Sequence, residues 1–230
     1  MLLLKKNQMN KKVIIIGGIG TAVNIAEQMQ DAIDKYGLKD EFLGFAFDDE
    51  KFTDEINGFP LLCKTRDAFD KYEKYNDVEF IYQLYRPDKL KERASWLPEF
   101  KVPTERYYNF IHPLATISRS VKMGKGNVIQ AGCVIGSNAV MGNHNTFNST
   151  CLFGHDTHIG DHNFFAAHSL IGSNTRLKNY IFMGLNSTVN NMVTIEDNIM
   201  IGMGSTVVKS IAEPDQVVIG APAKKIKDLI

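Results

Sequence analysis

A histidine followed directly by an acidic residue lies in the densest polar cluster of the second half of the chain, Gly154 to His162. A histidine with its ordinary pKa of about 6.5 is the usual general base at neutral pH, and an adjacent carboxylate can orient the ring and support its charged form. His155 and Asp156 could therefore serve as a base and its orienting acid. A solvated corner histidine on a repeat scaffold is the alternative, and the spacing supports both interpretations equally.

Two further histidines, His144 and His162, are eighteen residues apart and resemble half of a metal site. Zinc needs three or four converging ligands with hydrogen-bonded partners behind them. The pair alone falls short of that requirement, so we expect a surface ladder of stacked rings and no metal.

A glycine turn, Gly17-Gly18-Ile19-Gly20, joins the apolar run Lys12 to Ile16 to apolar residues at helical spacing. Bare backbone N–H groups at a helix start form a natural phosphate site. Asp48 and Asp49 close the second expected strand, where a carboxylate could accept hydrogen bonds from a ribose. The turn lacks the full G-x-G-x-x-G spacing, so glycines that permit tight packing beside a solvated acidic loop remain the alternative.

The element that must position His155 is a repeat, because every sixth residue from Ile111 to Val207 is apolar. Hexapeptide repeats indicate a parallel β-helix. We expect the glycines that follow these apolar residues, such as Gly154, to occupy corners with positive φ. The apolar column is Ile111, Ile117, Met123, Ile129, Ile135, Met141, Phe147, Phe153, Ile159, Phe165, Ile171, Leu177, Met183, Val189, Ile195, Ile201 and Val207.

The residue two positions before each apolar one points inward with it, because side chains alternate along a strand. These partners are mostly small or β-branched, as a narrow tube requires. If three sides close one coil, residues eighteen apart stack at roughly 4.8 Å. The expected core ladders are Asn127, Asn145 and Asn163; Cys133, Cys151, Ser169, Ser187 and Ser205; and Phe147 with Phe165.

Before the repeats, apolar runs alternate with helical patterns, which indicates a small parallel sheet flanked by helices. The expected fold class is therefore mixed α/β plus β, with a Rossmann-like domain in residues 1–107 and a β-helix with a C-terminal tail in residues 108–230. The strands are expected at Lys12–Ile16, Phe42–Phe47, Val78–Leu84 and Tyr107–Ile111, and the helices at 22–33, 65–75 and 87–97.

The composition excludes some partners. A formal net charge of zero gives no electrostatic reason to expect nucleic acid or an anionic membrane. Met1 to Lys6 are too short for a signal-peptide core, and no stretch of eighteen apolar residues occurs. The three cysteines form no C-x-x-C pair, so neither a disulfide framework nor zinc is indicated. We expect a cytoplasmic protein.

Taken together, the chain resembles the bacterial hexapeptide-repeat sugar acyltransferases, and more narrowly the branch of sialic acid O-acetyltransferases and nucleotide-amino-sugar N-acetyltransferases. The resemblance covers almost the whole chain and rests on the glycine turn, Phe47-Asp48-Asp49, the hexads, Gly154-His155-Asp156 and the closing Ile219 to Lys224 segment. It implies a left-handed β-helix and a homotrimer, with acetyl-CoA lying in grooves between neighbouring helices.

The resemblance also implies roles for single residues. His155 would remove a proton from the acceptor, Asp156 would orient His155, and the backbone N–H of Ser173 would face the developing oxyanion, although the family commonly has glycine there. The implied acetyl-CoA residues are Ser173, Gly202, Gly204, Gly220, Ala221, Pro222 and Lys224, and the implied acceptor residues are Gly17, Gly18, Gly20, Asp48 and Asp49.

The sequence thus predicts an acetyl-CoA-dependent acetyltransferase without a metal, which N-acetylates a nucleotide-linked amino sugar for surface glycan synthesis. One alternative is O-acetylation of sialic acid or another sugar hydroxyl. A second is a non-catalytic nucleotide-binding scaffold. Loop geometry, which periodicity does not reveal, sets the sugar, the nucleotide and the acyl group.

Overall fold

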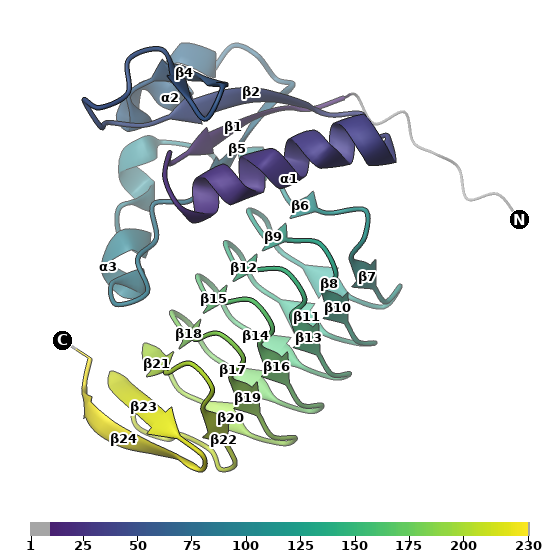
Figure 1. The fold of residues 1–230 in the computed structure, drawn as a ribbon, viewed down its shortest axis with the longest axis vertical. Coiled ribbons are helices and arrows are strands. Elements are labelled where there is room, and N and C mark those ends of the chain that lie inside the picture. The colour runs from purple at the N-terminus through teal and green to yellow at the C-terminus, as the bar shows by residue number, and fades with distance from the viewer. Residues whose placement is uncertain (1–9, 230) are drawn as a thin grey trace, which may run out of the picture.

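The computed structural model describes residues 10–229, which form an α/β unit and a column of short-stranded coils (Figure 1). The α/β sheet has the order β3-β4-β2-β1-β5. Its neighbours pair in parallel, except that β3 is antiparallel to β4, so the expected Rossmann-like sheet is confirmed. The strands are β1 Lys12–Ile16, β2 Glu41–Ala46, β3 Glu55–Ile56, β4 Phe59–Cys63 and β5 Val78–Tyr82. The signal-peptide prediction for Met1 to Lys6 concerns residues outside the described range.

Helix α1, Thr21–Tyr36, lies between the sheet and the first coils (Figure 1). Its apolar face, which includes Ile25 and Met29, shares a core with Phe110 of the first coil. The helices expected at 65–75 and 87–97 are present but broken into shorter pieces. These pieces are η1 Thr65–Asp67, α2 Ala68–Tyr72, α3 Leu90–Ala94 and η2 Leu97–Phe100, and a further turn, η3, spans Thr104–Arg106.

The expected strand at Tyr107–Ile111 is wrong as a member of the α/β sheet. Tyr107 makes only an isolated bridge to Phe80, and the following β6, Phe110–Ile111, pairs with β9 of the coils. The chain therefore leaves one unit and enters the other within this short run. The division between residues 107 and 108 stays a prediction.

From β6 onward, short strands recur every six residues and pair with strands eighteen residues away, for example Phe147 with Phe165. Three parallel sheets result, which confirms the left-handed parallel β-helix. The first sheet contains β6 Phe110–Ile111, β9 Val128–Ile129, β12 Thr146–Phe147, β15 Phe164–Phe165, β18 Phe182–Met183, β21 Ile199–Ile201, β23 Gln216–Gly220 and the antiparallel β24 Ala223–Asp228. The second contains β7 Thr116–Ile117, β10 Val134–Ile135, β13 Leu152–Phe153, β16 Leu170–Ile171, β19 Thr188–Val189 and β22 Thr206–Val207. The third contains β8 Lys122–Met123, β11 Val140–Met141, β14 His158–Ile159, β17 Arg176–Leu177 and β20 Thr194–Ile195.

The expected interior ladders are present. Asn145 donates from Nδ2 to Oδ1 of Asn127 at 3.0 Å, and Asn163 donates to Asn145 at 2.9 Å. Phe147 stacks on Phe165 with ring centroids 4.8 Å apart. Satisfied amides in a dry interior fix the register of the coils, because an unpaired buried amide is costly.

The expectation of positive φ at the repeat glycines is wrong. In the His155 turn, the left-handed residue is Asp156, at φ 58°, two positions after Gly154. Gly154 is needed for a different reason: a Cβ there would lie 2.6 Å from the backbone nitrogen of Ser173 in the next coil. Close stacking of coils, and not the turn itself, requires this glycine.

Within residues 10–229, no helix combines the length and the apolar character needed to cross a bilayer.

Candidate active site

His155 lies on an outer corner of the β-helix, in the turn between β13 and β14. Its side chain is 59% exposed, as the sequence predicted. Nδ1 of the imidazole lies 2.6 Å from Oδ2 of Asp156. Because Asp156 adopts the left-handed conformation, its side chain folds back toward the preceding residue on the same corner.

The Asp156 carboxylate fixes the tautomer of His155. Its hydrogen bond to His155 and a second one from Asn138, at 3.0 Å, lower the pKa of the Asp156 carboxyl group. An ionised carboxylate only accepts hydrogen bonds, so Nδ1 of His155 carries the proton. In the neutral form of the ring, the lone pair is then on Nε2 at an exposed corner, which is the arrangement of a general base.

Ser173 lies one coil beyond His155, where the sequence placed it. Its backbone N–H donates to Oδ1 of Asn191, at 2.7 Å. This N–H is therefore occupied by a side chain from the next coil. Its role as an oxyanion donor, which would require that bond to exchange, stays a prediction.

The residues expected to bind acetyl-CoA near the C-terminus gather around the last coil. Pro222 and Lys224 line a cavity of about 460 Å³ together with Lys209 and Lys225. Nζ of Lys225 pairs with Oδ1 of Asp228 at 2.6 Å, whereas Lys209 and Lys224 have no ion pair among the described residues, and such ammonium groups suit a phosphorylated ligand. The remaining residues of the set shape the backbone here: Gly204 and Gly220 have positive φ, Ala221 precedes Pro222, and a Cβ at Gly202 would meet Ile219.

Two of the glycines predicted to bind the acceptor have a packing role in the fold. A Cβ on Gly17 would lie 2.7 Å from the backbone oxygen of Gln83, and one on Gly18 would lie 2.6 Å from the Phe47 ring, so both glycines permit close packing. Gly20, at φ 56°, has no atom within 4 Å of its Cβ position. Of the three glycines of the turn, Gly20 is the one with open space beside it.

Asp48 and Asp49 line a cavity of about 400 Å³ beside the aromatic rings of Phe47 and Phe52. Asp48 accepts hydrogen bonds from the backbone N–H and the hydroxyl of Thr65. Oδ1 of Asp49 accepts from the backbone N–H of Lys51 at 3.0 Å. Both carboxylates therefore brace the loop that forms the cavity.

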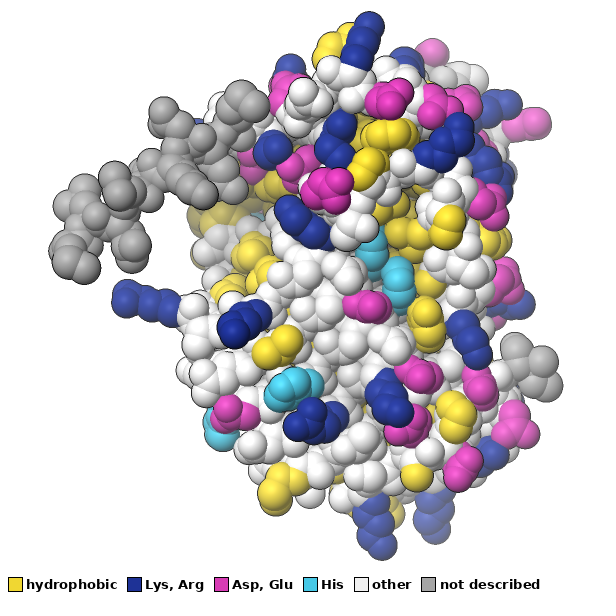
Figure 2. Space-filling view, turned by 180° about the vertical axis from the view of Figure 1, so that it is seen from behind, with side chains coloured by type: hydrophobic (Ala, Val, Ile, Leu, Met, Phe, Trp, Pro, Cys, Tyr) yellow, Lys and Arg dark blue, Asp and Glu magenta, His cyan; other side chains and the backbone are white. Residues whose placement is uncertain are grey.

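The stacking of His144 on His162 is confirmed, with centroids 5.1 Å apart and ring planes 4° apart. Its expected exposure is wrong, because residues 97–107 cover the ladder and leave His144 only 6% exposed. Burial lowers the pKa of His144 to about 3, helped by the neighbouring His162. Figure 2 shows histidines in a hollow between the two units, among hydrophobic side chains, and others near the opposite edge. Among the described residues, no group of three or more candidate metal ligands converges.

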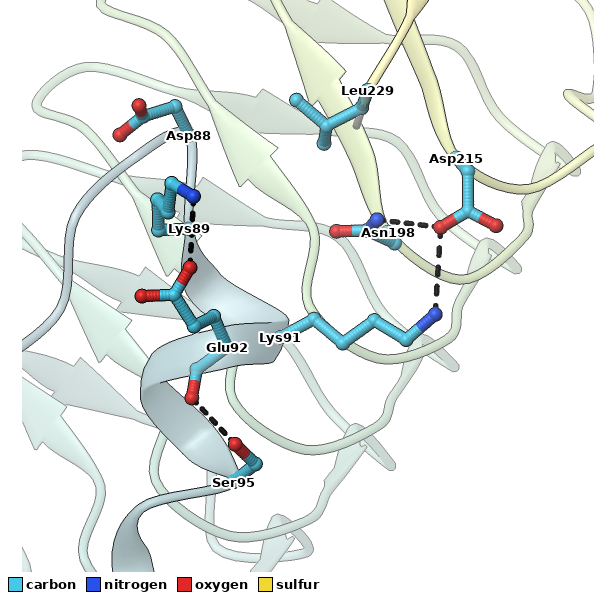
Figure 3. Close-up of a pocket in the computed structure, with 8 residues that line it drawn as sticks. All are labelled: Asp88, Lys89, Lys91, Glu92, Ser95, Asn198, Asp215 and Leu229. Carbon is cyan, nitrogen blue, oxygen red and sulfur yellow. Dashed lines mark hydrogen bonds and ion pairs between the residues drawn. The ribbon is translucent and has the colours of Figure 1, made fainter.

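A further cavity, of about 420 Å³, lies between α3 and the last coils (Figure 3). Its charged residues pair with each other: Lys89 with Glu92 at 2.8 Å, and Lys91 with Asp215 at 3.5 Å. Asn198 also donates to Asp215 at 2.6 Å. None of the residues predicted to bind a ligand lines this cavity.

Three residues beside the predicted site were missed: Asn138, Asn191 and Lys209. Each differs by a multiple of eighteen residues from a predicted one, since Asn138 lies one coil before Asp156 and Asn191 one coil after Ser173. The same spacing that placed Ser173 could have found them.

Comparison with known proteins places the fold among those of solved bacterial sugar acetyltransferases. No family model and no curated protein matches the sequence. Among solved structures, perosamine N-acetyltransferase from Caulobacter crescentus, a histidine-to-asparagine variant in complex with CoA and GDP-perosamine, superposes with a TM-score of 0.80. The identity is 22%, over 96% of this chain and 99% of that one.

Two further structures are similar over their whole length. The acetyltransferase domain of PglB from Neisseria gonorrhoeae, in complex with acetyl coenzyme A, has a TM-score of 0.78 and 22% identity, over 94% of this chain and 100% of that domain. WeeI from Acinetobacter baumannii has a TM-score of 0.76 and 20% identity, over 94% of this chain and 100% of that chain. At these identities the likeness establishes a common fold, and it confirms at that level the resemblance drawn from the sequence.

Proposed function

We propose that this chain is an acetyl-CoA-dependent acetyltransferase that N-acetylates a nucleotide-linked amino sugar for surface glycan synthesis. The observation that carries the proposal is the exposed His155, whose Nδ1 is held by Asp156 while Nε2 has no hydrogen-bond partner among residues 10–229. The fold supports it, because similar structures hold CoA with GDP-perosamine, or acetyl coenzyme A.

In this reaction, Nε2 of His155 takes a proton from the sugar amine as the amine nitrogen attacks the thioester carbonyl carbon. A C–N bond forms and the C–S bond breaks. The proton then passes from His155 to the departing thiolate, which leaves as free CoA. Asp156 keeps the ring oriented and stabilises its charged form while it holds the proton.

The cosubstrate would lie along the corner that carries His155. The corner column continues through Ser173 and Asn191 to Lys209, which lines the lysine-rich cavity of the last coil. Lys209, Lys224 and Lys225 would hold the phosphates of acetyl-CoA, and the acyl end would lie near His155. The cavity beside Asp48 and Asp49, with Gly20 open nearby, would take the nucleotide sugar.

The acceptor cavity and the base would come from different subunits of a homotrimer in the cytoplasm. Within residues 10–229, no hydrogen bond of the His155 or Asp156 side chain reaches the α/β unit. The outward faces of β10 and β13 leave Val134 and Leu152 exposed at 39% and 43%, a natural area for subunit contact.

The test is His155→Ala, assayed by CoA release with acetyl-CoA and a panel of GDP-, UDP-, CMP- and dTDP-linked amino sugars. We expect loss of nearly all turnover with an unchanged thermal midpoint. His158→Ala, which removes an exposed imidazole from the adjacent β14, is the matched control and should remain active. Retained activity in His155→Ala would refute the assigned base.

The same assay separates the alternatives. Mass spectrometry of the product, with hydroxylamine treatment, distinguishes an amide from the labile ester of O-acetylation. A scaffold without catalysis would show a thermal shift with a nucleotide sugar but none with CoA.

A further inference from the structure

Asn191 holds the backbone N–H of Ser173, the group that the resemblance assigns to the developing oxyanion. It lies two coils beyond His155 on the same corner column, and its exposed side chain reaches back one coil to Ser173. Oδ1 of Asn191 accepts the Ser173 N–H at 2.7 Å. The backbone N–H of Asn191 is itself held by Oδ1 of Asn190, at 2.9 Å. The Asn191 side chain is thus held to the coil through Oδ1, and the Asn191 backbone is held through its N–H.

At the neighbouring corner of the β-helix, bonds from a backbone N–H to an asparagine side chain of the next coil have a purely structural role. There the N–H of Asp161 donates to Oδ1 of Asn179 at 2.8 Å, and Nδ2 of Asn179 donates to Oδ1 of Asp197 at 2.9 Å. Each amide at that corner is used at both ends, because an acidic residue follows one coil later. Each Nδ2 group of this ladder therefore has a hydrogen-bond acceptor among the described residues.

The His155 corner differs at this point. Eighteen residues beyond Asn191 the sequence has Lys209, two residues after the last paired residue, Val207. The Lys209 ammonium group donates hydrogen bonds and cannot accept one. Nδ2 of Asn191 has no hydrogen-bond partner among residues 10–229. With Oδ1 held by Ser173, the Nδ2 group of this exposed side chain keeps both of its protons for another acceptor.

We propose that Nδ2 of Asn191, oriented by the Ser173 N–H, is the donor that stabilises the oxyanion in acetyl transfer. This inference rests on the proposed function. As the amine nitrogen attacks, the thioester carbonyl oxygen becomes an oxyanion and accepts a hydrogen bond from Nδ2. When the intermediate collapses, the carbonyl re-forms, the C–S bond breaks, and the thiolate takes the proton that His155 removed from the amine. A donor held in place beforehand needs no reorganisation in the transition state.

The structure offers two variants that separate a donor from a structural cap. Asn191→Asp keeps an oxygen acceptor for the Ser173 N–H but loses both protons of Nδ2. Asn191→Ala loses the donor and frees the Ser173 N–H. We expect kcat to fall about 100-fold in both, which is the size of effect measured for a single side-chain oxyanion donor, while KM for acetyl-CoA changes little.

The assay measures CoA release from acetyl-CoA with the amino sugar of the same panel that the wild type uses fastest. Asn179→Ala is the control, because it removes an equivalent cap from a corner without His155 and should keep its kcat. Thermal midpoints show that each variant is folded, and Asn191→Asp keeps the cap if Asn191→Ala does not fold.

Three results would overturn the inference. Asn191→Ala as fast as the wild type, or faster, would make Ser173 the donor and Asn191 its competitor. Asn191→Asp with an unchanged kcat would reduce Asn191 to a cap, and an equal loss in Asn179→Ala would assign the effect to distorted coils. If the wild type is active and His155→Ala is not, these results remove only the role of Asn191. A wild type that transfers no acetyl group removes the proposed function and this inference together.

Discussion

Acid should destabilise this protein through His144, whose imidazole is buried at the junction of the two units. Tyr107 lies edge-on to the ring, at 4.4 Å between centroids, and His162 stacks on it. Nδ1 of His144 has no hydrogen-bond partner among the described residues. The Asp161 carboxylate raises the pKa of the stacked His162, but burial outweighs it and lowers that pKa. A proton on His144 therefore finds no compensating charge.

The size of the effect follows from the two pKa values of His144. The folded-state pKa is lowered to about 3, whereas an unfolded histidine titrates at about 6.5. Between these values the unfolded chain binds one more proton than the folded chain, so the free energy of unfolding falls as the pH falls. From pH 7 to pH 5 the loss is about 2 kcal/mol for this one group.

The assay is equilibrium urea unfolding at pH 7, 6 and 5, at fixed protein concentration, for the wild type and His144→Asn. Asparagine tolerates the left-handed backbone at this position, where φ is 55°. The variant should lose about 2 kcal/mol less than the wild type between pH 7 and pH 5. His168→Asn, an exposed histidine at an equivalent corner with φ 63°, is the control and should follow the wild type. Equal pH dependence in His144→Asn and the wild type would refute the reasoning.

Three other predictions concern the active corner and the assembly. Asp156→Asn keeps the left-handed turn but removes the carboxylate that holds Nδ1 of His155, so kcat should fall about 10- to 100-fold at an unchanged thermal midpoint; unchanged kcat would leave Asp156 without an orienting role. Gly154→Ala places a Cβ 2.6 Å from the Ser173 nitrogen and should destabilise the fold by about 1–3 kcal/mol in urea, and an unaffected midpoint would contradict the close approach of the coils. Leu152→Lys puts a charge on the exposed face of β13 and should convert the proposed trimer to monomers in sedimentation velocity, whereas an intact trimer would move the interface elsewhere.

Periodicity predicted most of the β-helix, because an apolar side chain at every sixth residue leaves little choice in how successive strands pair. The eighteen-residue spacing correctly stacked Asn127 under Asn145 and brought His155 to an outer corner. It could not predict the cover over His144, because residues 97–107 follow no repeat and reach the coils from another unit. It also misplaced the left-handed residue, since the coil turns at Asp156 and not at Gly154.

The sequence contains signals for two further structural features that were not predicted. Asn57-Gly58, with φ values of 50° and 77°, forms the tight turn between β3 and β4, and an Asn-Gly pair between short apolar runs is a strong hairpin signal. The bond from Ser173 to Asn191 lies at the coil spacing. Whether a side chain takes up a backbone N–H, however, depends on its rotamer, which spacing does not determine.

Because the coils stack at a fixed spacing, the length of the β-helix can change only by whole coils. His155 and Lys209 share one column, three coils apart, which corresponds to about 14 Å along the axis. A whole added or deleted coil would lengthen or shorten that span by about 4.8 Å and leave each end intact. A long ligand that binds at both His155 and Lys209 therefore requires a fixed number of coils between them. A protein of this fold that binds a longer or shorter ligand would differ in length by whole coils of eighteen residues.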